Sequence, residues 1–314
     1  MKKIFTIFMI VALTFMTGCE KSVEPVNAKI IVPFGGPAIT HIQMIKEEPE
    51  LLEGSQYSIE VVRGADPLVA AFTSKSHDII IAPTNLGAKM YNANSEYVLA
   101  ATIAWGANYL VSTEGDFNLE DLRGQEIIAF GKNATPDVVL TSVLKKAGIY
   151  DEVTIKYVNS VNDVQAEIIA GNAKFGLLAE PILTVTKTKK QGLGVLDLQE
   201  EWASISGKSI IPQAGVFVSK SLLENNKDFV TNYLAQLEKS IDFANTSEDL
   251  ASYSDEIEFG LPGAIVAKAT PSSNLKFVNA IDSKDDLLVY FNEIMELNPK
   301  LIGDKLPDAD FYLK

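Results

Sequence analysis

The chain has 314 residues, of which 47% are hydrophobic and 22% charged, and this balance excludes an intrinsically disordered protein. Its formal net charge of -14 makes it a poor partner for nucleic acid. A single cysteine and two histidines exclude an internal disulfide and leave too few side chains for a Cys- or His-based metal site. We therefore expect no nucleic-acid partner, no metal and no cofactor.

The N-terminus is typical of an export signal. Lys2 and Lys3 precede an uncharged apolar run of 13 residues. This run is shorter than the ~20 residues that a membrane-spanning helix needs. We predict a signal peptide over residues 1–18 and a polar tether over residues 19–27.

The segment Met16-Thr17-Gly18-Cys19 resembles the lipobox of bacterial lipoproteins, which usually has leucine at the position of Met16. The resemblance implies cleavage before Cys19 and attachment of lipid to its sulfur. The protein would then be extracytoplasmic and anchored to the bacterial cell membrane. A secreted protein with an unmodified Cys19 is the alternative.

Strands and helices alternate along the first third of the chain. Short apolar runs predict strands over residues 29–33, 58–62, 78–82 and 97–103. Helices are predicted between these strands, over residues 39–48 and from residues 66 and 83 onward. At the second of them, Asp66 fits an N-cap and Pro67 the first helical position.

The same alternation begins again after residue 106. A short helical turn over residues 119–122 precedes a strand over 126–130 and a turn-rich loop over 131–134. A helix then ends at Gly148, with Thr135 as its expected N-cap and Pro136 as its first residue. The later elements are predicted as strands over 153–158, 174–178 and 215–219 and helices over 161–170, from 180 and over 221–244, followed by helical segments with breaks at 262–263 and 271–273. This alternation predicts an α/β fold with mostly parallel sheets.

The order of several motifs resembles a known family. They are DIIIAPTN, LEDLRGQEIIAFGKNATPDVVLTSVLKKAGI, AEIIAGNAKFGLLAEP and AGVFVSKSLLENNKDFVTNYLAQLEKSIDFA. Each motif alone is a weak indicator of any family. Their order and spacing together resemble those of the solute-binding lipoproteins of ABC importers. The similarity is to the nitrate/sulfonate/taurine and thiamine-precursor group, and it covers nearly all of the mature chain.

The resemblance implies a type II periplasmic-binding fold, in which two α/β lobes trap a ligand between them. Lobe one would comprise residues 28–106 plus 216–314, and lobe two residues 107–215. The chain would cross between the lobes near residues 105–107 and 213–215, where glycines suit a hinge.

The ligand is expected at the carboxyl ends of the strands, because ligands of open α/β sheets bind there. For each candidate residue, a turn position without ligand contact is the alternative. The candidate ligand-binding residues are Phe34, Gly35, Gly36, Pro37, Thr84, Asn85, Trp105, Asn133, Ala134, Thr135, Asp137, Glu180 and Gln213.

The charges near these positions favour a neutral or amine-bearing heterocycle over a small oxyanion. Asp137 falls in the first turn of its predicted helix, where it would repel a bound anion. Arg63 and Arg123 are the only arginines, which limits the clamps available for an anion. Phe34 and Trp105 could supply stacking surfaces for a flat ring.

The leading functional hypothesis is a lipid-anchored, monomeric receptor that delivers a small solute to the permease of an ABC importer. On this hypothesis the protein is not an enzyme, since the sequence has no nucleophile–base pair and no Gly-rich dinucleotide fingerprint. An enzyme on the same fold is the alternative, similar to thiamine-pyrimidine synthases or menaquinone-pathway enzymes. A sensory ligand-binding lipoprotein is a third hypothesis.

Overall fold

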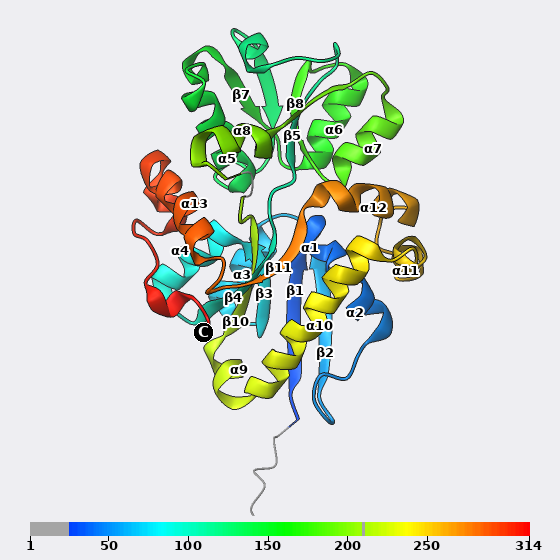
Figure 1. Ribbon diagram of the computed structural model, residues 1–314, viewed down its shortest axis with the longest axis vertical. Coiled ribbons are helices and arrows are strands. Elements are labelled where there is room, and N and C mark those ends of the chain that lie inside the picture. The colour runs from blue at the N-terminus through cyan, green and yellow to red at the C-terminus, as the bar shows by residue number, and fades with distance from the viewer. Residues whose placement is uncertain (1–24, 209–210) are drawn as a thin grey trace, which may run out of the picture.

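The computed structural model describes residues 25–208 and 211–314, and the predicted signal peptide and Cys19 lie outside this part. Within it, the strands form two sheets, each flanked by helices, and the two lobes built on these sheets are stacked along the long axis (Figure 1). Lobe one is built on the sheet that contains the first strand. Lobe two is the other, drawn uppermost in Figure 1. Among the described residues, none of the helices has the length and apolar character needed to cross a membrane.

The sheet of lobe one has the order β11-β4-β10-β3-β1-β2 in the described part of the chain. β1 is parallel to β2 and β3, whereas β10 is antiparallel to β3 and β4, and β11 is antiparallel to β4. Its strands are β1 (Asn27–Pro33), β2 (Gln56–Val62), β3 (Ile79–Pro83), β4 (Tyr97–Ala104), β10 (Ala214–Ser219) and β11 (Leu275–Asn279).

The sheet of lobe two has the order β7-β6-β8-β5-β9 in the residues that the structure describes. β6 is parallel to β7 and β8, and β5 is antiparallel to β8 and β9. Its strands are β5 (Asn108–Ser112), β6 (Glu126–Ala129), β7 (Thr154–Tyr157), β8 (Phe175–Ala179) and β9 (Gly194–Asp197).

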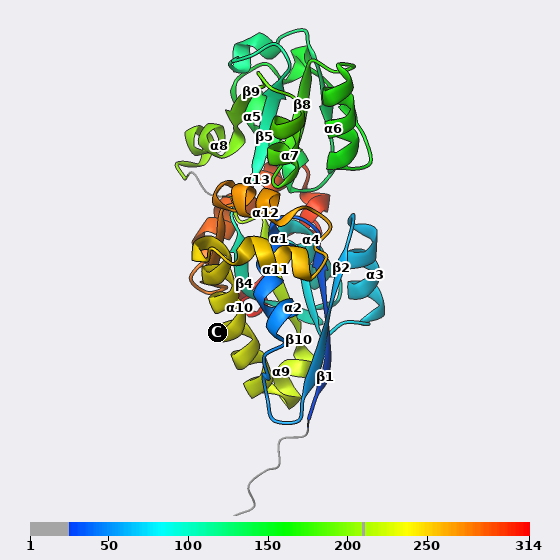
Figure 2. The same ribbon diagram turned by 90° about the vertical axis from the view of Figure 1, so that its right-hand side faces the viewer.

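Helices cover both faces of each sheet, and α12 and α13 lie where the lobes meet (Figures 1 and 2). The α-helices are α1 (Gly36–Ile39), α2 (Ile42–Glu47), α3 (Asp66–Ser74), α4 (Thr84–Asn94), α5 (Thr135–Lys146), α6 (Val161–Ala170), α7 (Ile182–Lys189), α8 (Leu198–Ser206), α9 (Lys220–Asn225), α10 (Lys227–Thr246), α11 (Leu250–Glu256), α12 (Gly263–Ala269) and α13 (Lys284–Leu297). Short 3-10 helices are η1 (Leu119–Leu122), η2 (Tyr150–Glu152), η3 (Thr270–Ser273), η4 (Pro299–Ile302) and η5 (Ala309–Phe311).

The predicted α/β fold class is confirmed, but the sheets are mixed rather than mostly parallel. The reason is the path of the chain between the lobes. β10 returns from lobe two and therefore runs away from the lobe junction, whereas its neighbours β3 and β4 run toward it. β5 enters lobe two directly from β4 and therefore runs away from the junction, whereas β8 runs toward it. β5 is consequently antiparallel to β8.

Several elements differ from those expected from the sequence. β5, β9, β11 and α8 are additional, and the expected long helix is divided at Asn226 into α9 and α10. The N-caps were also wrong by one residue, since Ala65 and Ala134 occupy these positions without a side-chain cap. Thr135 is instead the first residue of α5, and its hydroxyl accepts a hydrogen bond from Tyr290 at 3.0 Å.

One cluster of buried apolar side chains runs through both lobes. It includes Phe217 in β10 and Phe175 in β8. Between them, Trp202 of α8 meets Tyr290 of α13 at a ring-centroid distance of 6.2 Å, and both side chains are fully buried. The lobes therefore share hydrophobic packing on the side of α13, in addition to the polar contacts at their junction.

Candidate functional site at the lobe junction

Two chain crossings join the lobes and hold the base of the junction together. The first runs from the end of β4 at Ala104 to the start of β5 at Asn108, and the second leads into β10. The backbone N–H of Gln213 donates to Ala104 O at 2.9 Å, so the crossings lie side by side. Gly106 in the first crossing has a φ of 91°, a left-handed value that glycine adopts without strain.

A row of polar side chains lines this base. The backbone N–H of Thr84 donates to Gln213 O at 3.1 Å. The Gln213 side chain in turn accepts a hydrogen bond from Asn108 Nδ2 at 3.3 Å. Asn85, which follows Thr84 at the start of α4, donates from its Nδ2 to the carbonyl oxygen of Asn133 in the opposite lobe at 3.5 Å. These bonds place groups from both lobes and from both crossings in one polar cluster.

Glu180 lies on the lobe-two side of this cluster, directly after β8. Its backbone N–H donates to Ala107 O at 3.2 Å. Its carboxylate accepts hydrogen bonds from Ser272 Oγ at 2.8 Å across the junction, and from the Thr184 hydroxyl and backbone N–H at 3.0 and 3.1 Å. Only 6% of the residue is exposed, and this burial raises the pKa of the Glu180 carboxyl, although the hydrogen bonds from Ser272 and Thr184 oppose the shift.

The loop before α5 is held in place by the carboxylate of Asp137, which lies in the first turn of that helix. Asp137 accepts a hydrogen bond from the backbone N–H of Asn133 at 2.7 Å, and it also accepts hydrogen bonds from Thr141 and from the Tyr157 hydroxyl. Asn133 has a φ of 64°, which asparagine tolerates better than most residues. The backbone N–H of Asn133, one of the expected ligand-binding residues, is therefore occupied by Asp137.

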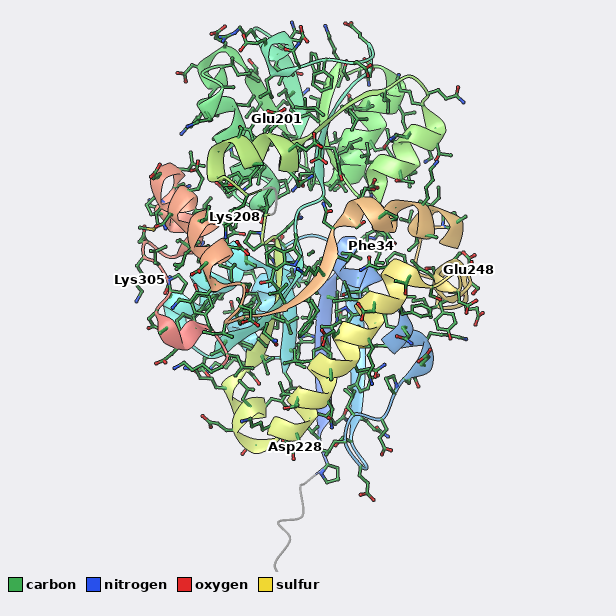
Figure 3. The ribbon with its side chains drawn as sticks, viewed as in Figure 1. Phe34, Glu201, Lys208, Asp228, Glu248 and Lys305 are labelled. Atoms are coloured by element: carbon green, nitrogen blue, oxygen red, sulfur yellow. The ribbon has the colours of Figure 1, made fainter. Side chains whose placement is uncertain are left out.

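Further contacts draw the two lobes together around this cluster. The Tyr109 hydroxyl of lobe two donates to Ser272 O at 2.8 Å. Lys208 forms an ion pair with Asp286 of α13. Figure 3, which labels Phe34 and Lys208, shows both side chains beside the lobe junction.

The structure brings many of the expected site residues to the junction, but not all of them face it. Phe34 stacks on Phe259 at 5.3 Å, with Arg63 over its ring. The Trp105 indole N–H donates to Lys276 O at 2.9 Å, so this ring is held against β11. The residues that lie at or beside the polar cluster are Gly35, Thr84, Asn85, Asn133, Ala134, Thr135, Glu180 and Gln213, and Gly36 and Pro37 lie behind Gly35 in α1.

Sequence reasoning missed several polar residues at the junction. They are Asn108, Tyr109, Gln199, Ser272 and Tyr290. Gln199 brackets the backbone of Asn108, since its Oε1 accepts from the Asn108 N–H at 3.0 Å and its Nε2 donates to Asn108 O at 3.1 Å. The available signal for Asn108 was a polar residue two positions after Gly106, at the start of an apolar run.

This arrangement can bind a small molecule and exchange a proton with it. A carboxylate accepts about four hydrogen bonds. Glu180 receives three from protein groups, which leaves acceptor capacity for a bound molecule. In residues 25–208 and 211–314, no group of three or more His, Cys, Asp and Glu side chains is arranged to hold a metal ion.

The fold and its two-lobed junction define a class, the type II periplasmic-binding fold. Over 91% of this chain and 98% of the other, the structure is similar to that of an ABC transporter from Parabacteroides distasonis, with 22% identity and a TM-score of 0.78. It is also similar to the periplasmic aliphatic sulphonate binding protein SsuA from Escherichia coli, with 16% identity over 93% of each chain and a TM-score of 0.72. The periplasmic nitrate-binding protein NrtA from Synechocystis matches with 13% identity over 92% of this chain and 87% of its own, with a TM-score of 0.63.

The chain belongs to the Menaquinone biosynthesis family, whose model matches residues 61–261, more than half of its length. The prediction that the protein is not an enzyme is therefore wrong, because this family match indicates a family of biosynthetic enzymes on the same fold. A search of curated proteins found no match. The type II periplasmic-binding fold that the sequence resemblance implied is confirmed. For the function, the family match supports the enzymatic alternative better than the receptor hypothesis.

Proposed function

We propose that the protein is an enzyme of menaquinone biosynthesis that binds a small molecule between its lobes and exchanges a proton with it through Glu180. The observation that carries this proposal is a carboxyl that is almost fully buried, contacts both lobes and retains acceptor capacity. A general acid–base group works best when its pKa is near the operating pH. Burial shifts the pKa of Glu180 upward, toward that range.

The proposed substrate is a neutral or amine-bearing molecule, such as a heterocycle, rather than a small oxyanion. Both arginines are engaged on the protein, since Arg123 pairs with Glu120 and Glu152, and Arg63 stacks on Phe34. The ionisable group in the polar cluster is instead the carboxyl of Glu180. An anion would therefore meet a carboxylate where the anion-binding relatives named above would need positive charge or N–H donors.

The proposal is tested by deleting the gene from the source cell and measuring extracted menaquinone by chromatography. Loss of menaquinone, restored by the wild-type chain on a plasmid, is the expected result. Unchanged menaquinone in the deletion strain would contradict an essential biosynthetic role. Growth on medium supplemented with menaquinone separates this role from a general defect.

A second candidate is a lipid-anchored receptor that delivers its ligand to the permease of an ABC importer. It is favoured by the export-type N-terminus with Cys19 and by the fold shared with ABC-transporter proteins. If this candidate holds, the deletion strain keeps its menaquinone and loses uptake of the ligand. The two candidates therefore give opposite results in one experiment.

Export and anchoring through Cys19 are proposed independently of which candidate holds. The substitution Cys19→Ala removes the sulfur that would carry the lipid, so the variant is expected to move from the membrane fraction to the soluble fraction. Immunoblots of separated fractions measure this change, with Ser22→Ala in the tether as the matched control. A Cys19→Ala variant that stays on the membrane would refute the anchor.

A further inference from the structure

His41 lies between α1 and α2, and its side chain is fully buried. Its Nδ1 lies 3.1 Å from Pro37 O and 2.8 Å from Thr40 Oγ1. Its Nε2 lies 2.9 Å from the Tyr233 hydroxyl of α10. Thr40 and Tyr233 are also fully buried, so water does not compete for these contacts. Both ring nitrogens are therefore engaged inside lobe one.

The hydrogen-bond network fixes the tautomer of this ring. The Thr40 hydroxyl donates to Pro37 O at 2.6 Å, so its hydrogen is used and its lone pairs face the imidazole. Nδ1 of His41 therefore faces two acceptors, Pro37 O and Thr40 Oγ1, and must carry the ring hydrogen. Nε2 of the neutral ring then accepts the hydrogen of the Tyr233 hydroxyl. His41 thus presents a donor to α1 and an acceptor to α10.

A second proton on this ring would be costly. Nε2–H would point at the Tyr233 oxygen, and the hydroxyl hydrogen of Tyr233 would lose its acceptor in a buried environment. Burial accordingly lowers the pKa of His41 to about 4, although the hydrogen bond to Pro37 O opposes the shift. Tyr233 and its neighbour Tyr57 of β2 also stay uncharged, because burial raises the pKa of both hydroxyls. The network is therefore neutral at neutral pH.

The donor of His41 holds the end of α1. This helix has only four residues, too few to be stable by itself. Its Pro37 carbonyl accepts hydrogen bonds from two side chains, since the backbone N–H of His41 donates instead to Ala38 O. The other ring nitrogen fastens this end of the helix to α10 through Tyr233. Without the imidazole, α1 would lose both of these contacts.

The start of α1 meets the candidate site. Gly35 precedes the helix with a φ of 121°, a value that glycine adopts without strain. A Cβ placed on Gly35 would lie 3.9 Å from the carbonyl oxygen of Glu180 in lobe two. A Cβ placed on Gly36 would lie 3.9 Å from Ser273 Cβ, and Ser273 follows Ser272, which donates to the Glu180 carboxylate. α1, at the edge of lobe one that faces lobe two in Figure 1, therefore contacts both the backbone of Glu180 and the turn that bonds to its carboxylate.

We propose that His41 is a positioning residue of the candidate site. As a neutral Nδ1–H imidazole it fixes α1, and with it the backbone that faces Glu180 and the turn that carries Ser272. Its ring does not touch the bound molecule. Loss of the Nδ1–H donor loosens α1, whereas loss of the Tyr233 hydroxyl alone leaves Pro37 O with both of its donors. This inference rests on the proposed use of Glu180 and adds the side chain that holds the surroundings of that carboxyl.

NMR on the purified, untagged chain labelled with ¹⁵N-histidine tests the tautomer without any substitution at His41. A protonated and an unprotonated ring nitrogen differ strongly in ¹⁵N chemical shift. The chain has only two histidines, so the His77→Gln variant assigns the signals of His41. The expected spectrum is that of a neutral Nδ1–H ring, unchanged between about pH 6 and pH 8. A hydrogen on Nε2, or a doubly protonated ring at neutral pH, would overturn the inference.

Hydrogen exchange measures whether His41 holds α1. In His41→Leu, the amides of residues 35–44 are expected to exchange at least about tenfold faster than in the wild type, because leucine provides no donor. Asparagine can still donate to Pro37 O, so in His41→Asn these amides should stay within about threefold of the wild-type rate. Tyr233→Phe removes only the hydroxyl and is the matched control, with the same expected limit. Equal acceleration in the leucine and asparagine variants, or in Tyr233→Phe, would contradict the role of the donor.

The effect on the site is measured by menaquinone accumulation in the deletion strain, with immunoblots to confirm equal amounts of each variant. His41→Leu is expected to slow accumulation at least about tenfold, whereas His41→Asn and Tyr233→Phe stay within about threefold of the wild type. Both His41 variants lose the contact with Tyr233, so rescue by asparagine separates positioning from a general loss of stability. A wild-type rate for His41→Leu would show that the imidazole does not position the site.

These outcomes are separate from those of the proposed function. A deletion strain that keeps its menaquinone refutes the biosynthetic role, while the NMR and exchange measurements still decide whether His41 holds the element that faces Glu180. Conversely, an Nε2–H ring refutes the positioning role and leaves the biosynthetic role standing.

Discussion

Replacing Glu180 by glutamine is expected to slow the proposed reaction by about 10²–10⁴-fold, the range that a general acid–base group contributes. Glutamine has nearly the same shape, and its oxygen still accepts hydrogen bonds from Ser272 and the Thr184 hydroxyl. It cannot, however, exchange a carboxyl proton. The rate at which menaquinone accumulates after induction of the variant in the deletion strain measures the effect.

The matched control for this substitution is Glu126→Gln, because Glu126 is exposed at the start of β6 in the same lobe. It removes the same charge without touching the junction, and menaquinone should accumulate at the wild-type rate. Immunoblots confirm equal amounts of each variant. If Glu180→Gln accumulates menaquinone within about threefold of wild type, Glu180 is not an acid–base group and its burial needs another explanation.

Replacing Trp202 by alanine is expected to lower the free energy of unfolding by about 3–5 kcal/mol, the usual cost of removing a large buried aromatic side chain. Trp202 is 1% exposed, and from α8 of lobe two it packs against Tyr290 of lobe one. Its loss would leave a cavity in packing that both lobes share. Urea denaturation followed by circular dichroism measures the change.

Two further variants make this prediction specific. Trp202→Phe keeps a ring against Tyr290 and should lose less stability than alanine. Ile281→Ala truncates an apolar side chain that is 46% exposed, so it should change the free energy of unfolding by less than about 0.5 kcal/mol. A loss below about 1 kcal/mol for Trp202→Ala would contradict the shared packing between the lobes.

The parts of the fold that were predicted correctly have a strong local signal. β3 is a continuous apolar run, and its residues Ile79–Ala82 are buried as that composition requires. The helix α6 was predicted with the correct bounds, because Ser160 provides a capping box at its start and Gly171 a left-handed end. In these segments, neighbouring residues alone determine the structure.

The errors arise where distant segments decide the outcome. Thr135 is a residue type favoured at N-caps, but its hydroxyl accepts a hydrogen bond from Tyr290, 155 residues further along the chain. β11 is an edge strand whose existence depends on pairing with β4. Direction in the sheets follows the path between lobes, which no local pattern encodes.

The candidate site shows the same division. Thr84, Asn85, Glu180 and Gln213 could be predicted because they follow strands or lie in the hinge. Ser272 could not be predicted, because the sequence around it indicates only a turn. The folded chain places its hydroxyl 2.8 Å from the Glu180 carboxylate. The activity was harder to predict than the site, because the same fold serves both binding proteins and enzymes.

The position of Ser272 and Tyr290 near the C-terminus has a consequence for synthesis of the protein on the ribosome. Lobe two is complete in sequence once β9 and α8 have been made, yet its Glu180 accepts one of its three hydrogen bonds from Ser272, and its Thr135 accepts one from Tyr290. The junction is therefore assembled last, after residues 272–290 have left the ribosome. Until then the site at the junction is unfinished, and a truncated product that ends before Ser272 lacks both of these hydrogen bonds.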